Sequence, residues 1–101
     1  GVPARGKKCD AIEGIIDEAK EHMSEIKDER VLDAGIISSA QAVEHYEISR
    51  YGTLSAWAKQ LGYTDAAKLL DATLAEESKT DEALTKLAET AVNSAAQKKA
   101  A

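Results

Sequence analysis

The sequence predicts an all-α protein, and three observations support this. First, 19 of the 101 residues are alanine, and leucine, glutamate and lysine are also frequent, all of which are strong helix formers. Second, the single proline is Pro3, so no proline interrupts a helix after the N-terminus. Third, apolar residues recur every three or four positions, and no strict alternation lasts beyond a few residues. The length fits one small domain.

Charge and composition argue against several classes of protein. The 13 Lys and Arg residues against 18 Asp and Glu give a net charge of −5, without a dense basic stripe. We therefore expect no binding to nucleic acid or to an anionic membrane surface. No stretch approaches the roughly 18 apolar residues of a membrane span, and no signal peptide opens the chain. A single cysteine, Cys9, excludes an internal disulfide framework and fits a reducing compartment, so we expect a cytoplasmic protein.

The N-terminal part of the chain predicts a linker followed by a helix. Residues 1–7 have the composition of a linker, and because the chain does not begin with Met we expect a fragment or a trimmed form of a longer protein. A first helix is predicted over residues 8–27. Its apolar positions form one stripe at i, i+3, i+4 and i+7 spacing: Ile12, Ile15, Ile16, Ala19, Met23 and Ile26.

Two long helices are predicted next, with a tight turn between them. Asp28 is suited to cap the second helix, over residues 29–61, and Gly62 suits the left-handed position after its C-terminus. Thr64 is expected to cap the third helix, over residues 64–93.

So short a connection predicts an antiparallel hairpin, with the first helix packed across it. The tail, residues 94–101, is expected to fray. Residues 8–93 would then form a single helical domain.

Four carboxylates fall on the apolar faces of the two long helices. On a helical wheel, Glu44 and Glu47 lie within the apolar arc of the second helix. Glu77 lies at the centre of the apolar stripe of the third helix, and Asp81 lies about 40° from it. Both pairs are roughly 25 Å from the turn at Gly62, at about 1.5 Å per residue. We therefore expect the four carboxylates to meet between the two helices.

A metal ion would explain this arrangement. Burying one unpaired carboxylate costs several kcal/mol, and neither apolar arc contains Lys or Arg to neutralise four of them. Ferritin-like bundles hold di-iron or di-manganese centres with carboxylates from facing helices. In the alternative interpretation each residue is a boundary residue whose carboxylate reaches water. Two pairs at one height favour metal binding by Glu44, Glu47, Glu77 and Asp81.

Several motifs resemble the YciE/YciF-type ferritin-like family. They include the run Ala40-Gln41-Ala42-Val43-Glu44-His45-Tyr46-Glu47-Ile48, then Tyr51-Gly52-Thr53-Leu54 and Ala56-Trp57-Ala58. Gly6-Lys7-Lys8-Cys9, Ile12-Glu13-Gly14 and Leu74-Ala75-Glu76-Glu77-Ser78-Lys79, followed by Asp81 and Leu84, resemble it too. The resemblance covers nearly the whole chain.

The resemblance implies a stress-associated, ferritin-like four-helix bundle with an additional crossover helix. It assigns the first helix to the crossover and the two long helices to the second half of the bundle, so the family's first two helices would be absent. Glu44, Glu47 and Glu77 would be metal ligands. Ferritin-like helices often have Glu-x-x-His here, whereas Thr80 follows Glu77 at that spacing, and Asp81 would substitute. His45, off the centre of the arc, is expected near the site or at the surface.

Three functions remain open at this stage. The first is a ferritin-like dimetal protein holding two iron ions, or manganese or zinc, and oxidising Fe(II) with oxygen or peroxide. The second is a metal-free helical stress or scaffold protein, and the third is an adaptor that grips a partner helix. The second helix has an apolar arc of about 200°, more than one neighbouring helix covers. We therefore expect a homodimer in which a second hairpin completes the four-helix bundle.

Overall fold

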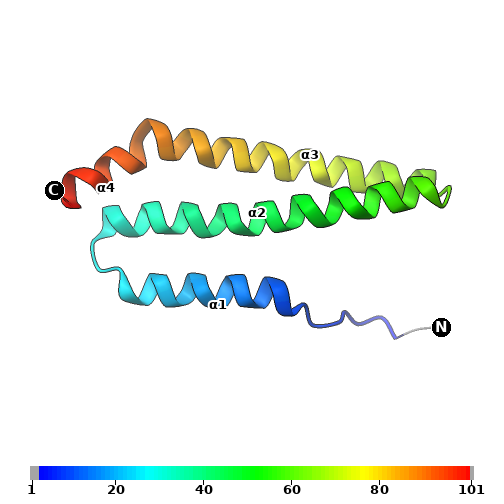
Figure 1. Ribbon diagram of the computed structural model, residues 1–101, viewed down its shortest axis with the longest axis horizontal. Coiled ribbons are helices and arrows are strands. Elements are labelled where there is room, and N and C mark those ends of the chain that lie inside the picture. Colours follow the sequence, from blue (N-terminus) through cyan, green and yellow to red (C-terminus); the bar gives the residue numbers. More distant parts are fainter. Residues whose placement is uncertain (1–2, 101) are drawn as a thin grey trace.

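The computed structural model describes residues 3–100, and the side chains up to residue 98. This part of the chain is helical and contains no strand, as predicted. The elements are α1 (Asp10–Glu25), α2 (Glu29–Gln60), α3 (Thr64–Leu87), the π-helix η1 (Ala88–Val92) and α4 (Asn93–Ala100). Figure 1 shows α2 between α1 and α3, with α2 and α3 forming a long antiparallel hairpin. The all-α class and the hairpin are therefore confirmed.

The helices lie side by side in one flat layer (Figure 1). The principal extents are 55 × 29 × 16 Å, so the layer is little thicker than a single helix with its side chains. The radius of gyration is 17.3 Å, whereas a compact domain of this length has about 13 Å. Within the described residues, α1 contacts α2 and no other helix. No helix among the described residues consequently packs on the two broad faces of the layer.

Local signals explain where α2 begins and ends. The Asp28 carboxylate accepts hydrogen bonds from the backbone N–H groups of Arg30 (3.0 Å) and Val31 (3.2 Å), as expected for an N-cap. Gly62 has φ +81°, and its N–H donates to the carbonyl of Lys59, while the Tyr63 N–H donates to that of Ala58. This is the Schellman arrangement, which satisfies the last carbonyls of the helix.

The predicted cap of the third helix is wrong. Tyr63 occupies the N-cap position of α3 without a side-chain capping bond, and Thr64 is already the first helical residue. The tight Schellman turn causes this shift, because α3 begins directly after Gly62 and Tyr63.

The helix boundaries differ from the predicted ones at two further places. α1 is shorter at both ends than the predicted residues 8–27. The third helix does not run uninterrupted to residue 93, because the wider π-helical turn η1 follows α3. α4 then contacts α2 (Figure 1). The predicted frayed tail, residues 94–101, is helical as far as residue 100. Residue 101 lies outside the described part, so its fraying remains a prediction.

The hydrophobic core is thin. Among the described residues, the buried hydrophobic ones are Ile37, Ala58 and Ala67, and no large side chain is fully buried. Large apolar side chains are exposed instead: Ile16, Met23, Ile36, Leu54, Trp57, Leu61, Tyr63, Leu69 and Leu87. Their exposure follows from the flat shape, because the described helices contact one another within the layer and none packs on its broad faces. None of the described helices has the length and apolar character needed to cross a membrane.

Candidate metal centre

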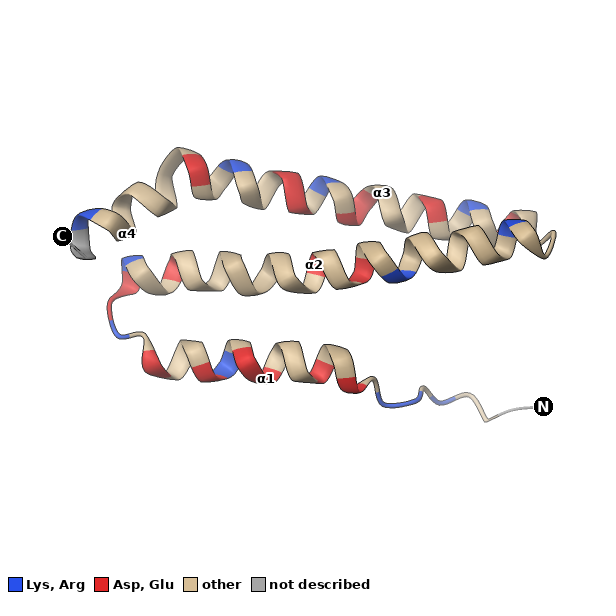
Figure 2. Cartoon of the chain, viewed as in Figure 1, with Lys and Arg blue, Asp and Glu red and all other residues tan. Residues whose placement is uncertain are grey.

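The candidate site lies midway along α2. Figure 2 shows two long uncharged stretches of this helix, residues 34–43 and 51–58, on either side of a segment that contains Glu44, Glu47 and Arg50. The uncharged stretches contain the buried residues of the helix, Ile37, Ser55 and Ala58. The carboxylates therefore interrupt a surface that is otherwise built for packing.

The structure brings three of the four predicted carboxylates together. Glu44 and Glu47 from α2 and Glu77 from α3 each offer one oxygen, and these three atoms lie within 4.8 Å of one another. All three residues are half-buried. We call this set the glutamate cluster. The cluster arises because i, i+3 residues of one helix share a face, and the antiparallel hairpin sets Glu77 opposite them.

The close approach of the carboxylates raises two pKa values. The pKa of Glu47 is raised above 4.5, first by a hydrogen bond with Glu77, and then by burial and by the charge of Glu77. The pKa of Glu77 is raised mainly by a hydrogen bond with Glu44, although its hydrogen bond with Glu47 acts in the opposite direction. Carboxylates this close hold protons more tightly than free ones, because a proton relieves their repulsion. A cation would relieve it in the same way.

One atom of the glutamate cluster has no partner. Glu44 Oε2 is buried, and no described residue forms a hydrogen bond with it. None of the ion pairs among the described residues involves Glu44, Glu47 or Glu77. A buried oxygen without a partner is costly, which makes this atom a natural ligand for a cation. Carboxylate oxygens suit divalent ions such as iron, manganese and magnesium, and the residues present therefore fit a metal.

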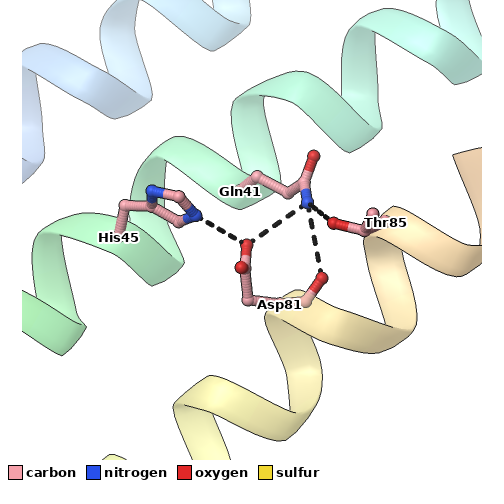
Figure 3. Close-up of polar contacts among 4 residues, drawn as sticks. All are labelled: Gln41, His45, Asp81 and Thr85. Carbon is pink, nitrogen blue, oxygen red and sulfur yellow. Dashed lines mark hydrogen bonds and ion pairs between the residues drawn. The ribbon is translucent and has the colours of Figure 1, made fainter.

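The fourth predicted ligand, Asp81, is engaged elsewhere. Its Oδ1 lies 3.0 Å from Nε2 of His45 and accepts a hydrogen bond from the side-chain amide of Gln41 at 3.3 Å. The same amide donates to the backbone carbonyl of Asp81 (3.4 Å) and to the hydroxyl of Thr85 (2.7 Å). Figure 3 shows these four side chains meeting between the two helices. Asp81 is therefore not part of the glutamate cluster, because the 40° that separates it from Glu77 turns it toward His45.

Sequence reasoning did not find this second group of polar side chains. His45 was expected near the site or at the surface, and Gln41 and Thr85 were not predicted to be functional. A signal was available, since Gln41/His45 and Asp81/Thr85 are both i, i+4 pairs. In an antiparallel hairpin such pairs face one another when they lie at similar distances from the turn.

A further contact fixes α1 beside the site. Sγ of Cys9 lies 3.1 Å from the hydroxyl of Tyr46, and the guanidinium of Arg50 lies 5.2 Å from the centre of the Tyr46 ring. The hydrogen bond with Tyr46 is the main reason why the pKa of Cys9 is lowered. Tyr46 directly precedes Glu47, so this contact ties the start of α1 to the segment of α2 that carries the glutamate cluster.

Fold and site together define a class: an all-helical protein whose long hairpin carries a carboxylate cluster between its two helices. The chain belongs to the family described as a domain of unknown function (DUF892), whose model matches residues 1–97. This confirms the YciF-type resemblance at the level of the family.

Characterised relatives have the same sequence features and fold. Protein YciF of Escherichia coli (strain K12) is 54% identical over 93 residues, which are 92% of this chain and 56% of that protein. The crystal structure of the E. coli stress protein YciF matches with a TM-score of 0.83 at 50% identity, over 92% of this chain and 58% of that one. YcfI from Rhodopseudomonas palustris, to which a structural role has been ascribed, matches with a TM-score of 0.80 at 50% identity, over 84% of this chain and 54% of that one. The chain thus spans little more than half the length of these relatives.

Proposed function

We propose that this chain is a ferritin-like, carboxylate-bridged dimetal-binding protein associated with stress, with iron as the metal and manganese or zinc as substitutes. The observation that carries the proposal is the unpartnered, buried Oε2 of Glu44 within a cluster of three carboxylates. Similarity to a protein described as a stress protein supports the physiological context.

Each glutamate has a distinct position in the proposed site. Glu44 contributes the buried oxygen, whereas Glu47 and Glu77 contribute carboxylates that exchange protons for the metal. Fe(II) held there would give its electrons to oxygen or peroxide and would itself be oxidised. The neighbouring contact of Cys9 with Tyr46 holds the segment that carries Glu47.

Three carboxylates are few for two ions, and we propose that a second copy of the chain supplies the others. The thin core and the exposed apolar side chains support this view, because contiguous apolar surface is usually covered in soluble proteins. A two-fold axis would place a second glutamate cluster opposite the first, at the same height. The homodimer would then be a four-helix bundle with the metal at its interface, acting in the cytoplasm.

Equilibrium metal analysis tests the proposal. The chain is equilibrated with Fe(II) under anaerobic conditions, or with Mn(II), and the metal bound at neutral pH is measured. Glu44→Gln and Glu77→Gln should lower the iron bound per chain, whereas Glu76→Gln, which removes an exposed neighbouring charge, should not. Unchanged iron content in the first two variants would refute the assignment.

Sedimentation tests the dimer. We expect a dimer at micromolar concentration and tighter association when metal is added, because a ligand shared by two chains favours the assembled state. A stable, well-folded monomer with and without metal would contradict the homodimer. The metal ligands are tested separately, by the equilibrium metal analysis.

A metal-free scaffold is the second candidate. The exposed apolar residues along the layer favour it, as does the structural role ascribed to the R. palustris relative. On this view the carboxylates stay protonated or hydrated, and the chain acts through helix–helix contacts. Equal Fe and Mn content in the wild-type chain and the Glu44→Gln variant, together with stable self-association, would favour this candidate over the first.

A further inference from the structure

A second pair of metal-binding side chains lies outside the glutamate cluster. His45 follows Glu44 on α2, and Asp81 lies one helical turn after Glu77 on α3. His45 Nε2 and Asp81 Oδ1 are 3.0 Å apart (Figure 3). Two ligand atoms of a tetrahedral zinc ion, each bound at about 2.1 Å, are about 3.4 Å apart. The two atoms therefore need to separate by only about 0.4 Å, giving up their direct contact, to bind one ion.

The pair is open to solvent through a groove. The groove has a volume of about 540 Å³ between α2 and the segment that runs from α3 through η1 to α4. His45, Asp81, Gln41 and Thr85 line it together with small and apolar residues. The side chain of His45 is 68% exposed and that of Asp81 is 21% exposed. A hydrated ion can thus reach the pair and keep water molecules as its remaining ligands.

Neighbouring side chains hold the carboxylate in place. Gln41 donates hydrogen bonds to Asp81 Oδ1 and to the Asp81 backbone carbonyl, and it is itself tied to the hydroxyl of Thr85. Hydrogen bonds of this kind orient metal ligands and strengthen binding. Gln41 is therefore a positioning residue rather than a ligand.

We propose that His45 and Asp81 form a second divalent-metal site, specific for transition metals that accept an imidazole ligand. Zn²⁺, Ni²⁺ and Cu²⁺ bind imidazole well, whereas Mg²⁺ prefers oxygen ligands alone. The site is separate from the glutamate cluster, which offers only carboxylates. It binds zinc whether or not the glutamate cluster holds a metal.

Zinc titration by calorimetry tests the site in the variant Glu44→Gln/Glu77→Gln, which lacks the carboxylate cluster. We expect this protein to keep one zinc ion per chain and to lose it when His45→Gln or Asp81→Asn is added. His22→Gln removes the other histidine, on α1, and is the matched control that should keep the ion. Gln41→Ala should weaken zinc binding about 10-fold or more without abolishing it. Mg²⁺ should not compete for the site.

A spectroscopic measurement distinguishes a ligand from a merely structural ion pair. Zinc should shift the imidazole NMR signals of His45 and leave those of His22 unchanged. If zinc binding persists unaltered in the His45→Gln and Asp81→Asn variants, or if the His45 signals do not respond, the second site is refuted. The glutamate-cluster proposal is judged separately, by whether Glu44→Gln and Glu77→Gln remove bound iron.

Discussion

Replacing Glu77 by glutamine should stabilise the metal-free protein while removing the ability of the glutamate cluster to bind iron. The oxygens of the glutamate cluster lie within 4.8 Å of one another. At that separation two unit charges repel by about 0.9 kcal/mol in water and by about 3.5 kcal/mol at an effective dielectric constant of 20. The residues are half-buried, and sharing of protons lowers the repulsion further. We therefore expect Glu77→Gln to raise the free energy of unfolding by ~1–2 kcal/mol at pH 8.

The effect should depend on pH in a defined direction. The pKa values of Glu47 and Glu77 are raised above 4.5, so the folded metal-free chain binds protons more tightly than the unfolded chain. Stability from these protons is fully present below about pH 4.5 and is lost as the pH rises through the raised pKa values. Glutamine has no proton to lose. The advantage of the variant should therefore be small at pH 4.5 and grow toward pH 8.

Urea unfolding followed by circular dichroism measures the difference, with a chelator present and the chain concentration held fixed. Glu76→Gln is the matched control, because it removes the same charge from the next, exposed position. If the two variants have equal stability at pH 8, or if the advantage of Glu77→Gln does not grow with pH, the carboxylates do not repel one another as argued. With saturating Fe(II) the order should reverse, since the wild-type chain and the Glu76→Gln control gain binding energy at the glutamate cluster and the Glu77→Gln variant does not.

Three smaller predictions concern the α2–α3 hairpin that carries the glutamate cluster. The pKa of Asp71 is lowered, first by the hydrogen bond from Ser55 and then by that from Lys59. The stabilising effect of the Asp71 carboxylate is therefore present above pH 3.8 and is lost as the pH falls through the lowered pKa. Ser55→Ala should destabilise the chain at pH 7 and make little difference in strong acid, which pH-dependent thermal unfolding would check. Asp28→Ala should cost about 1 kcal/mol in urea unfolding through the lost N-cap, and a neutral result would show that the cap is dispensable. Gly62→Ala should cost about 1 kcal/mol because φ is +81°, and an unchanged unfolding midpoint would contradict the assigned turn.

The sequence was a good guide to those parts of the fold that depend on local signals. The helical class, the start of α2 at Asp28 and the turn at Gly62 each follow from residues close in the chain, and each is confirmed. The π-helix η1 could not be predicted, because Ala88–Val92 contains no proline or glycine to mark it. It depends on the packing of α4 against α2, which lies far away in sequence.

The site shows the same contrast between what local sequence signals predict and what depends on packing between distant segments. A helical wheel gives the direction of each side chain, which was enough to bring Glu44, Glu47 and Glu77 together. It does not say which residue of the facing helix a side chain meets. Asp81 was therefore assigned to the glutamate cluster, although it meets His45. That choice depends on the relative rotation of the two helices, which is set by packing along the whole hairpin.

The order of contacts along the hairpin explains why polar groups are tolerated at its centre. Near the turn, Ala58 and Ala67 are buried, and small side chains let two helices approach closely. Toward the other end the interface contains the glutamate cluster, then the His45–Asp81 pair, and then the groove beside η1. Near the turn the hairpin is thus closed by small buried side chains and by the contacts of Asp71 with Ser55 and Lys59, whereas farther away, among the described residues, polar contacts accompany a single buried hydrophobic residue, Ile37. Few buried apolar side chains stabilise the end of the hairpin that is distant from the turn. A bound metal ion or a second chain would therefore stabilise that end most.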